Sequence, residues 1–302
     1  MRIAVTGATG FIGRHVVSHL ASRGDEVIQV GRPLERAALC KAFRSVDTVI
    51  HLAGVVSTSR DEEYVKVNVD GTREVAEAVH ESGARLVHVS SLAAAGPAPP
   101  DKPRVEDDPP APMTAYGRSK LAGERAITAT AGLRWTILRP GVVYGPGDRA
   151  LLPLFVLAAR GLLPLIGQAS AAYTFVYISD LVRAVAAAVD HGARGDVVFV
   201  GHPLPVTTRA LLEGVRQAVG RGAVIVPIPL PVLRLAAFVG DVGGALRGRP
   251  LPINSRRYAE LAAEGFVCRV DRLRDRLGVV AEISLDEGLA QAAAWYRREG
   301  RL

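Results

Sequence analysis

The chain has 302 residues, of which 49% are hydrophobic and 22% are charged, so it is long enough to bury a substantial core. Its formal net charge is +7, but the basic residues are scattered and lack interleaved aromatic residues, which argues against a nucleic-acid-binding protein. The two cysteines, Cys40 and Cys268, lie far apart and have no metal-ligand residues beside them. We therefore predict no metal site, no disulfide framework and a cytoplasmic location.

Strand-like and helix-like patterns alternate through the first half of the chain, which is typical of a parallel sheet flanked by helices. No N-terminal signal stands out, because the first strand is expected to start at Arg2. We predict strands at 2–6, 26–30, 47–51, 85–90 and 134–139, and helices at 11–23, 35–45, 61–82, 114–131 and 180–191. Seven prolines exclude a helix or central strand from the segment 96–112, which we predict to be a loop over the active site.

The first strand runs into the segment 7–13, Gly-Ala-Thr-Gly-Phe-Ile-Gly, and then into a helical pattern. Gly7 permits a tight turn, Gly10 lets the backbone approach a pyrophosphate, and Gly13 lets the helix pack closely. The amino end of that helix would attract the anion. A strand, a glycine turn and a helix in this order predict a dinucleotide site, and the alternative is an ordinary glycine-rich turn.

Tyr116 and Lys120 lie four residues apart in a predicted helix, so their side chains share one face. We expect the lysine cation to lower the pKa of the phenol from its usual value of about 10. The pair would then serve as proton donor and acceptor for chemistry that interconverts a carbonyl and an alcohol. Many helices carry this spacing, so the pair alone is a weak signal.

Taken together, the motifs resemble the extended short-chain dehydrogenase/reductase family, which contains the NAD-dependent epimerases and dehydratases. The resemblance runs over residues 1–190 and is carried by the segments 6–13, 47–54, 68–72, 87–91, 116–120, 138–147 and 175–180, with a looser echo at 277–278 and 284–289. The chain end, 295–300, is similar to the hydroxysteroid dehydrogenase and flavonol reductase-like branch.

The resemblance implies an α/β fold, a Rossmann-type doubly wound parallel sheet with a smaller C-terminal substrate lobe. Residues 1–145 and a returning segment near 173–200 would form the dinucleotide-binding domain, and 146–172 with most of 201–302 the substrate lobe. Family members usually carry another strand and helix before the Asp-x-Val-x-His strand, but here only 33–46 fill that gap. We therefore predict that the third of the usual seven strands is missing and that the adenine pocket is shallow.

The resemblance also implies catalytic roles. Tyr116 would be the general acid and base, and Lys120 would tune it and bind the nicotinamide ribose. Ser91 would hold the substrate oxygen; Ser90 is less suitable because neighbouring strand residues face opposite sides. Asn68 would either buttress the site or lie in a helix N-cap region. The expected cofactor contacts are Gly7, Thr9, Gly10, Phe11, Ile12, Gly13, Arg32, Leu52, Ala53, Gly54, Tyr116, Lys120, Pro140, Gly141, Val142 and Val143.

Cofactor preference depends on the end of the second strand. NAD-preferring members place an acid there, where this chain has Gly31. The next residue, Arg32, occupies a position where NADP-using reductases of the family carry an arginine. Because a guanidinium can pair with a 2′-phosphate, we favour NADP over NAD, with a solvated charge at a strand end as the alternative.

The substrate region is apolar. Nucleotide-sugar members of the family carry a phosphate-binding arginine where this chain has Tyr173, and the segments 151–165 and 224–239 are nearly uncharged. The prolines within 223–242 make a membrane-spanning helix unlikely to form there, and we predict a loop and a helix. An apolar pocket favours an apolar ligand, although the same surface could be core or a dimer face.

We therefore predict an NAD(P)-dependent oxidoreductase that interconverts a ketone and a secondary alcohol on a largely apolar small molecule. One alternative is a nucleotide-sugar epimerase or dehydratase with tightly bound NAD, in which Arg256 or Arg257 anchors the diphosphate. A second alternative is a nonenzymatic dinucleotide-sensing regulator. The shallow adenine pocket predicted from the missing strand is the feature in its favour. A homodimer through the helices at 61–82 and 114–131 is possible, as in relatives.

Overall fold

A six-stranded parallel sheet forms the centre of the computed structural model, which describes residues 1–58, 60–191, 195–220, 222–247 and 265–302. Its strands follow the order β10-β5-β4-β3-β1-β2, and every neighbouring pair is parallel. Their bounds are β1 (Arg2–Thr6), β2 (Glu26–Val30), β3 (Thr48–His51), β4 (Arg85–Val89), β5 (Arg134–Pro140) and β10 (Asp196–Val200). The predicted Rossmann-type α/β fold is confirmed.

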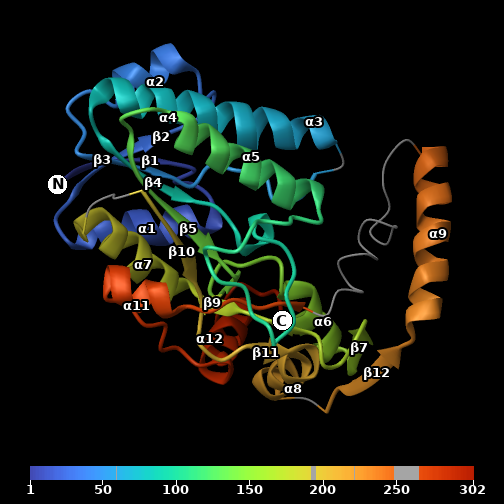
Figure 1. Ribbon diagram of the computed structural model, residues 1–302. Helices are drawn as coiled ribbons and strands as arrows, with labels where there is room; N and C mark the ends of the chain where they lie inside the picture. Colours follow the sequence, from blue (N-terminus) through green and yellow to red (C-terminus); the bar gives the residue numbers. More distant parts are fainter. Residues whose placement is uncertain (59, 192–194, 221, 248–264) are drawn as a thin grey trace.

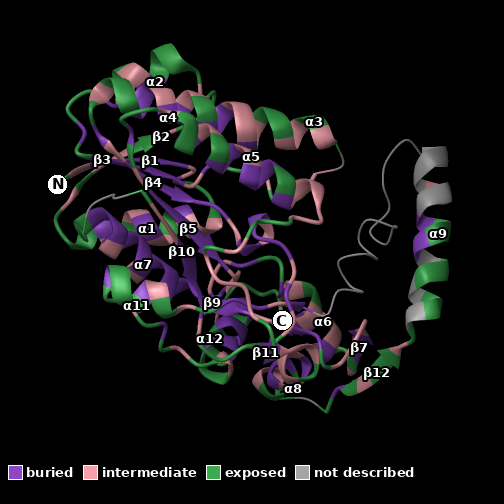
Figure 2. Cartoon of the chain, in the orientation of Figure 1, coloured by how far each residue is buried: buried purple, intermediate pink, exposed green. Residues whose placement is uncertain are grey.

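Helices cover both faces of this sheet (Figure 1). One face carries α1 (Phe11–Ser22) and α7 (Ile178–His191), which pack on each other, and the other carries α2 (Arg36–Ala42), α4 (Gly71–Ser82) and α5 (Ala115–Ala129). Each face has its own core of buried aliphatic side chains. Figure 2 shows the sheet as the most continuously buried part of the chain.

The predicted loss of the third strand is confirmed, because β2 lies at the edge of the sheet. The fully described connection from β2 to β3 contains a single short helix, α2, which packs on α4 through Leu39 and Phe43. An additional parallel strand here would need two crossovers of a dozen or more residues each, and only the 17 residues 31–47 join β2 to β3, so the connection is too short to add one.

The predicted helix at 61–82 is present but is not regular throughout. It is α-helical in α3 (Asp61–Tyr64), π-helical over Val65–Asp70, and α-helical again in α4. The prediction also assigned no strand to β10, although it placed that segment in the dinucleotide-binding domain. The segment 96–112 is a loop, as predicted, and is held by isolated bridges from Ala98 and Arg104 to Phe266 and Cys268.

Smaller strand pairs surround the carboxyl side of the sheet. These are β6 (Val142–Tyr144) with β9 (Phe175–Tyr177), β7 (Leu162–Ile166) with β12 (Val224–Ile228), and β8 (Ala172–Tyr173) with β11 (Val206–Thr207) and β13 (Gly265–Phe266). The accompanying helices are α6 (Leu152–Ala159), α8 (Thr208–Val219), α9 (Leu230–Arg247), α11 (Asp271–Leu277) and α12 (Leu285–Arg298). The segment 223–242 thus forms a strand and a helix rather than a loop and a helix. Among the described residues, no helix is long and apolar enough to cross a membrane.

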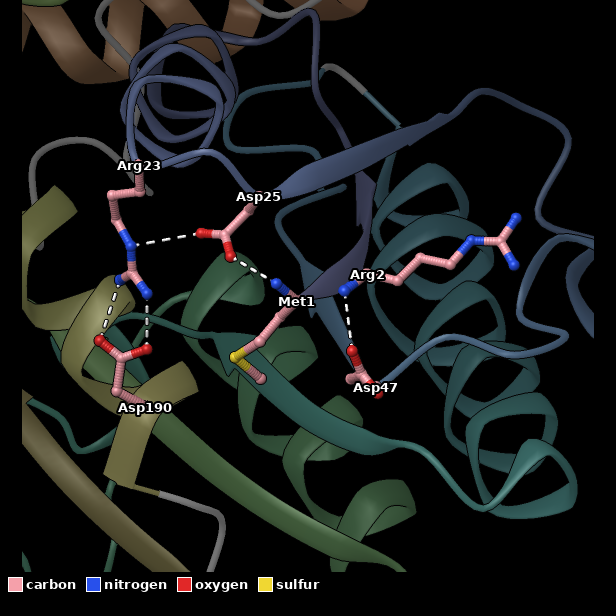
Figure 3. A network of polar contacts seen from close by, with 6 residues as sticks. All are labelled: Met1, Arg2, Arg23, Asp25, Asp47 and Asp190. Carbon is pink, nitrogen blue, oxygen red and sulfur yellow. Dashed lines mark hydrogen bonds and ion pairs between the residues drawn. The ribbon is translucent and has the colours of Figure 1, made fainter.

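The amino ends of the strands are joined by polar contacts (Figure 3). The Met1 ammonium donates to Asp25 over 2.9 Å, and Arg23 pairs with both Asp25 and Asp190. The backbone N–H of Arg2 donates to Asp47 over 2.7 Å. These contacts tie β1 to its neighbours at the edge opposite the strand carboxyl ends, where ligands bind in open α/β sheets.

Candidate active site

The glycine turn after β1 is closely packed. Gly7 has a φ of +71°, and a Cβ there would lie 2.6 Å from the backbone nitrogen of Ala53. A Cβ on Gly13 would lie 2.1 Å from the carbonyl oxygen of Gly7, so this glycine lets the helix pack on its own turn. Both positions therefore require glycine for space, and Gly7 also for its backbone conformation.

The amino end of α1 fits a pyrophosphate. Thr9 and Gly10 are exposed there, while Phe11 and Ile12 are partly buried in the first helical turn. The first N–H groups of a helix have no intrahelical acceptor and attract anions. Arg32 is exposed just beyond β2 and forms no ion pair with any residue in the described ranges, so its guanidinium is available to a ligand.

Ser91 and Tyr116 come together from two elements. Ser91 follows β4 and caps the short 3-10 helix η2 (Leu92–Ala94), where its Oγ accepts from the backbone nitrogen of Ala93. Tyr116 lies in the first turn of α5, which Thr114 caps by accepting from the Gly117 nitrogen over 2.9 Å. A Cβ on Gly117 would lie 2.3 Å from the Ala93 carbonyl oxygen, so the two elements pack tightly. The Ser91 side chain lies near enough to Tyr116 to lower the pKa of its phenol through hydrogen bonding.

The expected lowering of the Tyr116 pKa is wrong for this structure. Burial raises the pKa of the phenol above its usual value, and the nearby Tyr64 phenol adds to the rise. The hydrogen bond from Ser91 acts in the opposite direction but does not outweigh burial. Desolvation disfavours the charged phenolate, so Tyr116 is held as a neutral proton donor at neutral pH.

Lys120 is buried one turn after Tyr116 on the same side of α5, with 5% of its surface exposed. Its Nζ donates to the carbonyl oxygen of Val89 over 3.0 Å, at the end of β4. Burial lowers its pKa to about 8, while the Glu124 carboxylate acts to raise it. A Cβ on Gly54 would lie 3.9 Å from this Nζ. The exposed Gly54 therefore borders the ammonium group.

Asn68 buttresses the site, and the helix N-cap alternative does not apply because Asn68 lies inside the π-helical turn. The side chain is 1% exposed. Its Oδ1 accepts from the Val55 nitrogen over 2.8 Å, and its Nδ2 donates to the Val55 oxygen and the Ser119 Oγ, both over 2.9 Å. One amide thus fixes the loop after β3 to the helix that carries Tyr116 and Lys120.

Ser90 points away from Ser91, in line with the alternation expected of a strand. Its Oγ donates a short hydrogen bond to Glu124 of α5. Glu124 also forms a buried ion pair with Arg139 of β5, at 2.6 Å. This cluster joins β4, β5 and α5 beneath the site and leaves Ser91 to face Tyr116.

His51 and His88 are packed between strands, as the sequence indicated. Their rings stack with centroids 5.1 Å apart. His51 is hydrogen-bonded to Thr6 over 2.7 Å and to Thr72 over 3.0 Å. Burial lowers the pKa of His51 to about 3, and burial also lowers the pKa of His88 well below its usual value. Both imidazoles are therefore neutral at pH 7.

The segment after β5 lies beside the strand pair β6–β9. Pro140 is buried, and a Cβ on Gly141 would lie 2.1 Å from the Thr174 carbonyl oxygen. Val142 and Val143 are partly buried, as is Leu52 beyond β3. Tyr144 packs edge-on to Phe175 and Tyr177, with ring centroids 5.7 Å and 5.5 Å away, and is 2% exposed.

The structure shows what occupies the position of the expected phosphate-binding arginine. Tyr173 stacks on Phe266, with centroids 6.4 Å apart and ring planes at 14°. An aromatic pair thus occupies the position expected for an arginine in nucleotide-sugar enzymes. Arg256 and Arg257, the alternative anchors, lie outside the described residues.

The sequence reasoning missed Tyr64. This half-buried side chain of α3 lies against Tyr116, with ring centroids 6.1 Å apart and planes at 50°. Its hydroxyl donates to the Val56 carbonyl oxygen over 3.1 Å. The sequence could have indicated this position, because Tyr64 lies four residues before Asn68. Side chains at this spacing project toward the same side of a helix, here toward the loop after β3 and helix α5.

The comparison with protein families decides the identity. The family model described as "NAD dependent epimerase/dehydratase family" matches residues 3–201, about two thirds of the chain. The chain belongs to this family. It is 30% identical to "Ceramide reductase" of Caulobacter vibrioides, over 99% of this chain and 96% of the relative. It is 32% identical to "dTDP-6-deoxy-L-talose 4-dehydrogenase (NAD(P)(+))" of Kitasatospora kifunensis, over 76% of this chain and 83% of the relative.

A solved structure, "MoeE5 in complex with UDP-glucose and NAD", has the same fold. Its TM-score is 0.79 with 27% identity, and the match covers 99% of each chain. This member of the epimerase/dehydratase family is thus an NAD(P)-dependent enzyme of the extended short-chain dehydrogenase/reductase type. The alternative of a nonenzymatic regulator is therefore excluded. The relatives include both reductases and enzymes that act on nucleotide sugars.

Proposed function

We propose that this enzyme interconverts a ketone and a secondary alcohol on a largely apolar small molecule and prefers NADP. The observation that carries the proposal is the contact between Ser91 and a neutral Tyr116, with the buried Lys120 one helical turn away. These three groups lie at the carboxyl end of β4, the edge of the sheet that also carries the glycine turn.

The proposed chemistry assigns each group one task. A bound nicotinamide cofactor supplies or accepts the hydride. Ser91 Oγ and the Tyr116 hydroxyl hold the substrate oxygen, and Tyr116 donates its proton to that oxygen during reduction. Lys120 provides the positive charge beside the phenol and the ribose. The raised pKa of Tyr116 favours reduction, because the group that must donate a proton is protonated at neutral pH.

An apolar substrate is supported by aromatic residues of the substrate region and beside Tyr116. The stacked pair Tyr173 and Phe266 offers aromatic surface where a nucleotide sugar would need a cation. Tyr64 adds a second aromatic wall beside Tyr116, and we infer that it contacts the substrate. The relative named ceramide reductase acts, by its name, on a lipid, which supports the same class of substrate for this chain.

A nucleotide-sugar epimerase or dehydratase with tightly bound NAD is the second candidate. Its substrate class is supported by the complex of MoeE5 with UDP-glucose and by the relative named as a dTDP-sugar dehydrogenase, although a dehydrogenase changes its cofactor and does not support the epimerase reaction. Such an enzyme returns the hydride to its substrate, so the cofactor undergoes no net change. The homodimer, the cytoplasmic location and the division into two domains stay predictions.

The two candidates are separated by following the cofactor. The purified chain is incubated with reduced NADP and a series of apolar ketones, and in parallel with UDP- and dTDP-sugars without added cofactor. We expect loss of the reduced nicotinamide absorbance with a ketone, in amounts equal to the alcohol formed. Conversion of a nucleotide sugar without cofactor consumption, and no turnover of any ketone, would select the epimerase.

A further inference from the structure

Exposed apolar side chains gather on the ribbon β7–β12 and on helix α9, which follows it directly. Figure 1 shows α9 at the edge of the molecule, reached through β12, and Figure 2 shows much of its described surface as exposed. We call this set the apolar arm; it comprises Leu162, Val224, Val226, Val232, Leu235, Phe238 and Val239. Leu235 and Phe238 are each 64% exposed, which is unusual for large side chains that adjoin one another.

The exposed residues of α9 share one side of the helix. At about 100° per residue, Val232, Leu235, Phe238 and Val239 fall within an arc of about 120°. Ala237 and Gly240 lie on the other side and are buried. A helix on the surface of a globular protein normally turns its apolar side inward. The sequence of α9 is apolar all round, and four of its large apolar side chains face outward with no covering among the residues that the structure describes.

The charges around the arm are mainly positive. Arg234 is exposed and borders the arc beside Phe238, and the exposed Arg160 precedes β7. Neither arginine forms an ion pair with a residue of the described segments. In 160–166 and 222–247 the sequence contains three arginines and a single acidic residue, Asp241. A surface that combines exposed aliphatic and aromatic side chains with unpaired arginines is complementary to an apolar phase with an anionic boundary.

We propose that the apolar arm lies on the surface of an anionic lipid bilayer and holds the enzyme where an apolar substrate is dissolved. The inference rests on the proposed function, since it supplies the source of the apolar substrate. The side chains of α9 would enter the boundary between headgroups and acyl chains, while Arg234 stays at the level of the phosphates. A second copy of this chain is a poorer occupant, because it would bring its own arginines against these arginines.

The test is flotation of the purified full chain with vesicles of phosphatidylcholine containing phosphatidylglycerol, and with vesicles of phosphatidylcholine alone. We expect the wild-type chain to float with the mixed vesicles and to bind the neutral vesicles more weakly. The double variant Leu235→Glu/Phe238→Glu should bind the mixed vesicles at least about tenfold less, because it no longer buries two apolar side chains. Arg234→Glu should weaken binding to mixed vesicles more than to neutral ones.

Val280→Glu is the control, since Val280 is 43% exposed, lies outside the arm and gains one carboxylate, as each of the two positions in the double variant does. It should float like the wild type. The proposal is overturned if the wild type does not float, or if Val280→Glu loses as much binding as the double variant. It is also overturned if the double variant instead splits a dimer that does not bind vesicles.

Activity separates this inference from the proposed function. With a short, water-soluble ketone and no vesicles, kcat of the double variant should fall much less than its binding to vesicles, because Ser91, Tyr116 and Lys120 lie outside the arm. With a ketone dispersed in mixed vesicles, its rate should fall by about the same factor as its binding. Absence of ketone turnover in the wild type, with flotation retained, would reject the proposed function and leave the lipid surface standing.

Discussion

At the scale of single residues, burial rather than charge decides the state of the catalytic groups. Burial raises the pKa of Tyr116, and the same effect lowers the pKa of Lys120 to about 8. Desolvation favours the neutral form of both groups. The phenol is therefore protonated over the whole neutral range, whereas the lysine loses its charge within the range in which enzymes are assayed.

The pH dependence of reduction follows from these two pKa shifts. Turnover should be nearly constant from about pH 6 to pH 7.5 and should fall as the pH rises through about 8, where Lys120 becomes neutral. Tyr116 cannot cause this fall, because its pKa lies above 10 and not below it. Measurement of kcat against pH would show this fall in turnover near pH 8. In Lys120→Arg, which cannot lose its charge in this range, any remaining activity should not fall near pH 8.

Arg32 tests the choice between the two cofactors. Its guanidinium is exposed beyond β2 and unpaired among the described residues, so Arg32→Ala should remove only its contact with a 2′-phosphate. We expect KM for NADPH to rise by about tenfold or more and KM for NADH to change little, since a hydrogen bond to a charged group contributes about 1.5–3 kcal/mol. Arg14→Ala, on the exposed side of α1, is the control. Equal KM values for both cofactors in the wild-type enzyme would remove the role of Arg32.

At the scale of elements, the π-helical turn between α3 and α4 is held by one amide. Asn68→Leu would leave the N–H and C=O of Val55 without their partner and would remove the bond to Ser119 Oγ, which keeps its own bond to the Tyr116 carbonyl oxygen. Each buried polar group left without a hydrogen bond costs about 1–3 kcal/mol. We expect a loss of several kcal/mol in the free energy of unfolding, measured with urea. Ser119→Ala, which removes one of the three bonds, should lose clearly less; an equal loss would contradict this role of Asn68.

Sequence patterns gave bounds for ten elements of the dinucleotide-binding part, nearly all within two residues of the structure, because these strands are short apolar runs and these helices have clear apolar faces. They gave no bounds for most elements of the substrate region. They did not reveal β10, whose five residues become a strand through parallel pairing with the distant β5. They did not reveal the π-helical turn, because one additional residue in a turn hardly changes the apolar spacing over Val65–Asp70.

The sequence predicted which residues form the candidate site, but it did not predict their pKa values. Tyr116, Lys120 and Ser91 follow from local spacing and from the resemblance to a family. The direction of the Tyr116 pKa depends instead on Tyr64 and on the packing of η2 against α5, which are contacts between distant segments. Tyr64 was missed for the same reason.

At the scale of the whole molecule, the stacked pair His51 and His88 links stability to pH. Both pKa values are lower in the folded chain than the unfolded value of about 6.5. The pair therefore stabilises the fold above pH 6.5, and this stabilisation is lost as the pH falls through that value toward about 3. The free energy of unfolding should be lower at about pH 4.5 than at pH 7 by an amount on the order of a few kcal/mol.

His88→Leu isolates this effect from that of the carboxylates. The variant has one titrating imidazole fewer, so its loss of stability between the two pH values, measured with urea, should be clearly smaller than that of the wild type. The same loss in both proteins would show that the acid sensitivity arises elsewhere in the molecule.

The central claim is that Tyr116 delivers the proton while the cofactor delivers the hydride. The most direct test follows deuterium from reduced NADP labelled at the nicotinamide C4 into an apolar ketone, for the wild type, Tyr116→Phe and Tyr64→Phe. We expect deuterium at the carbinol carbon with the wild type, a rate lower by about 10²–10⁴ in Tyr116→Phe with cofactor affinity retained, and a nearly unchanged rate in Tyr64→Phe. Transfer at the wild-type rate in Tyr116→Phe would contradict the account.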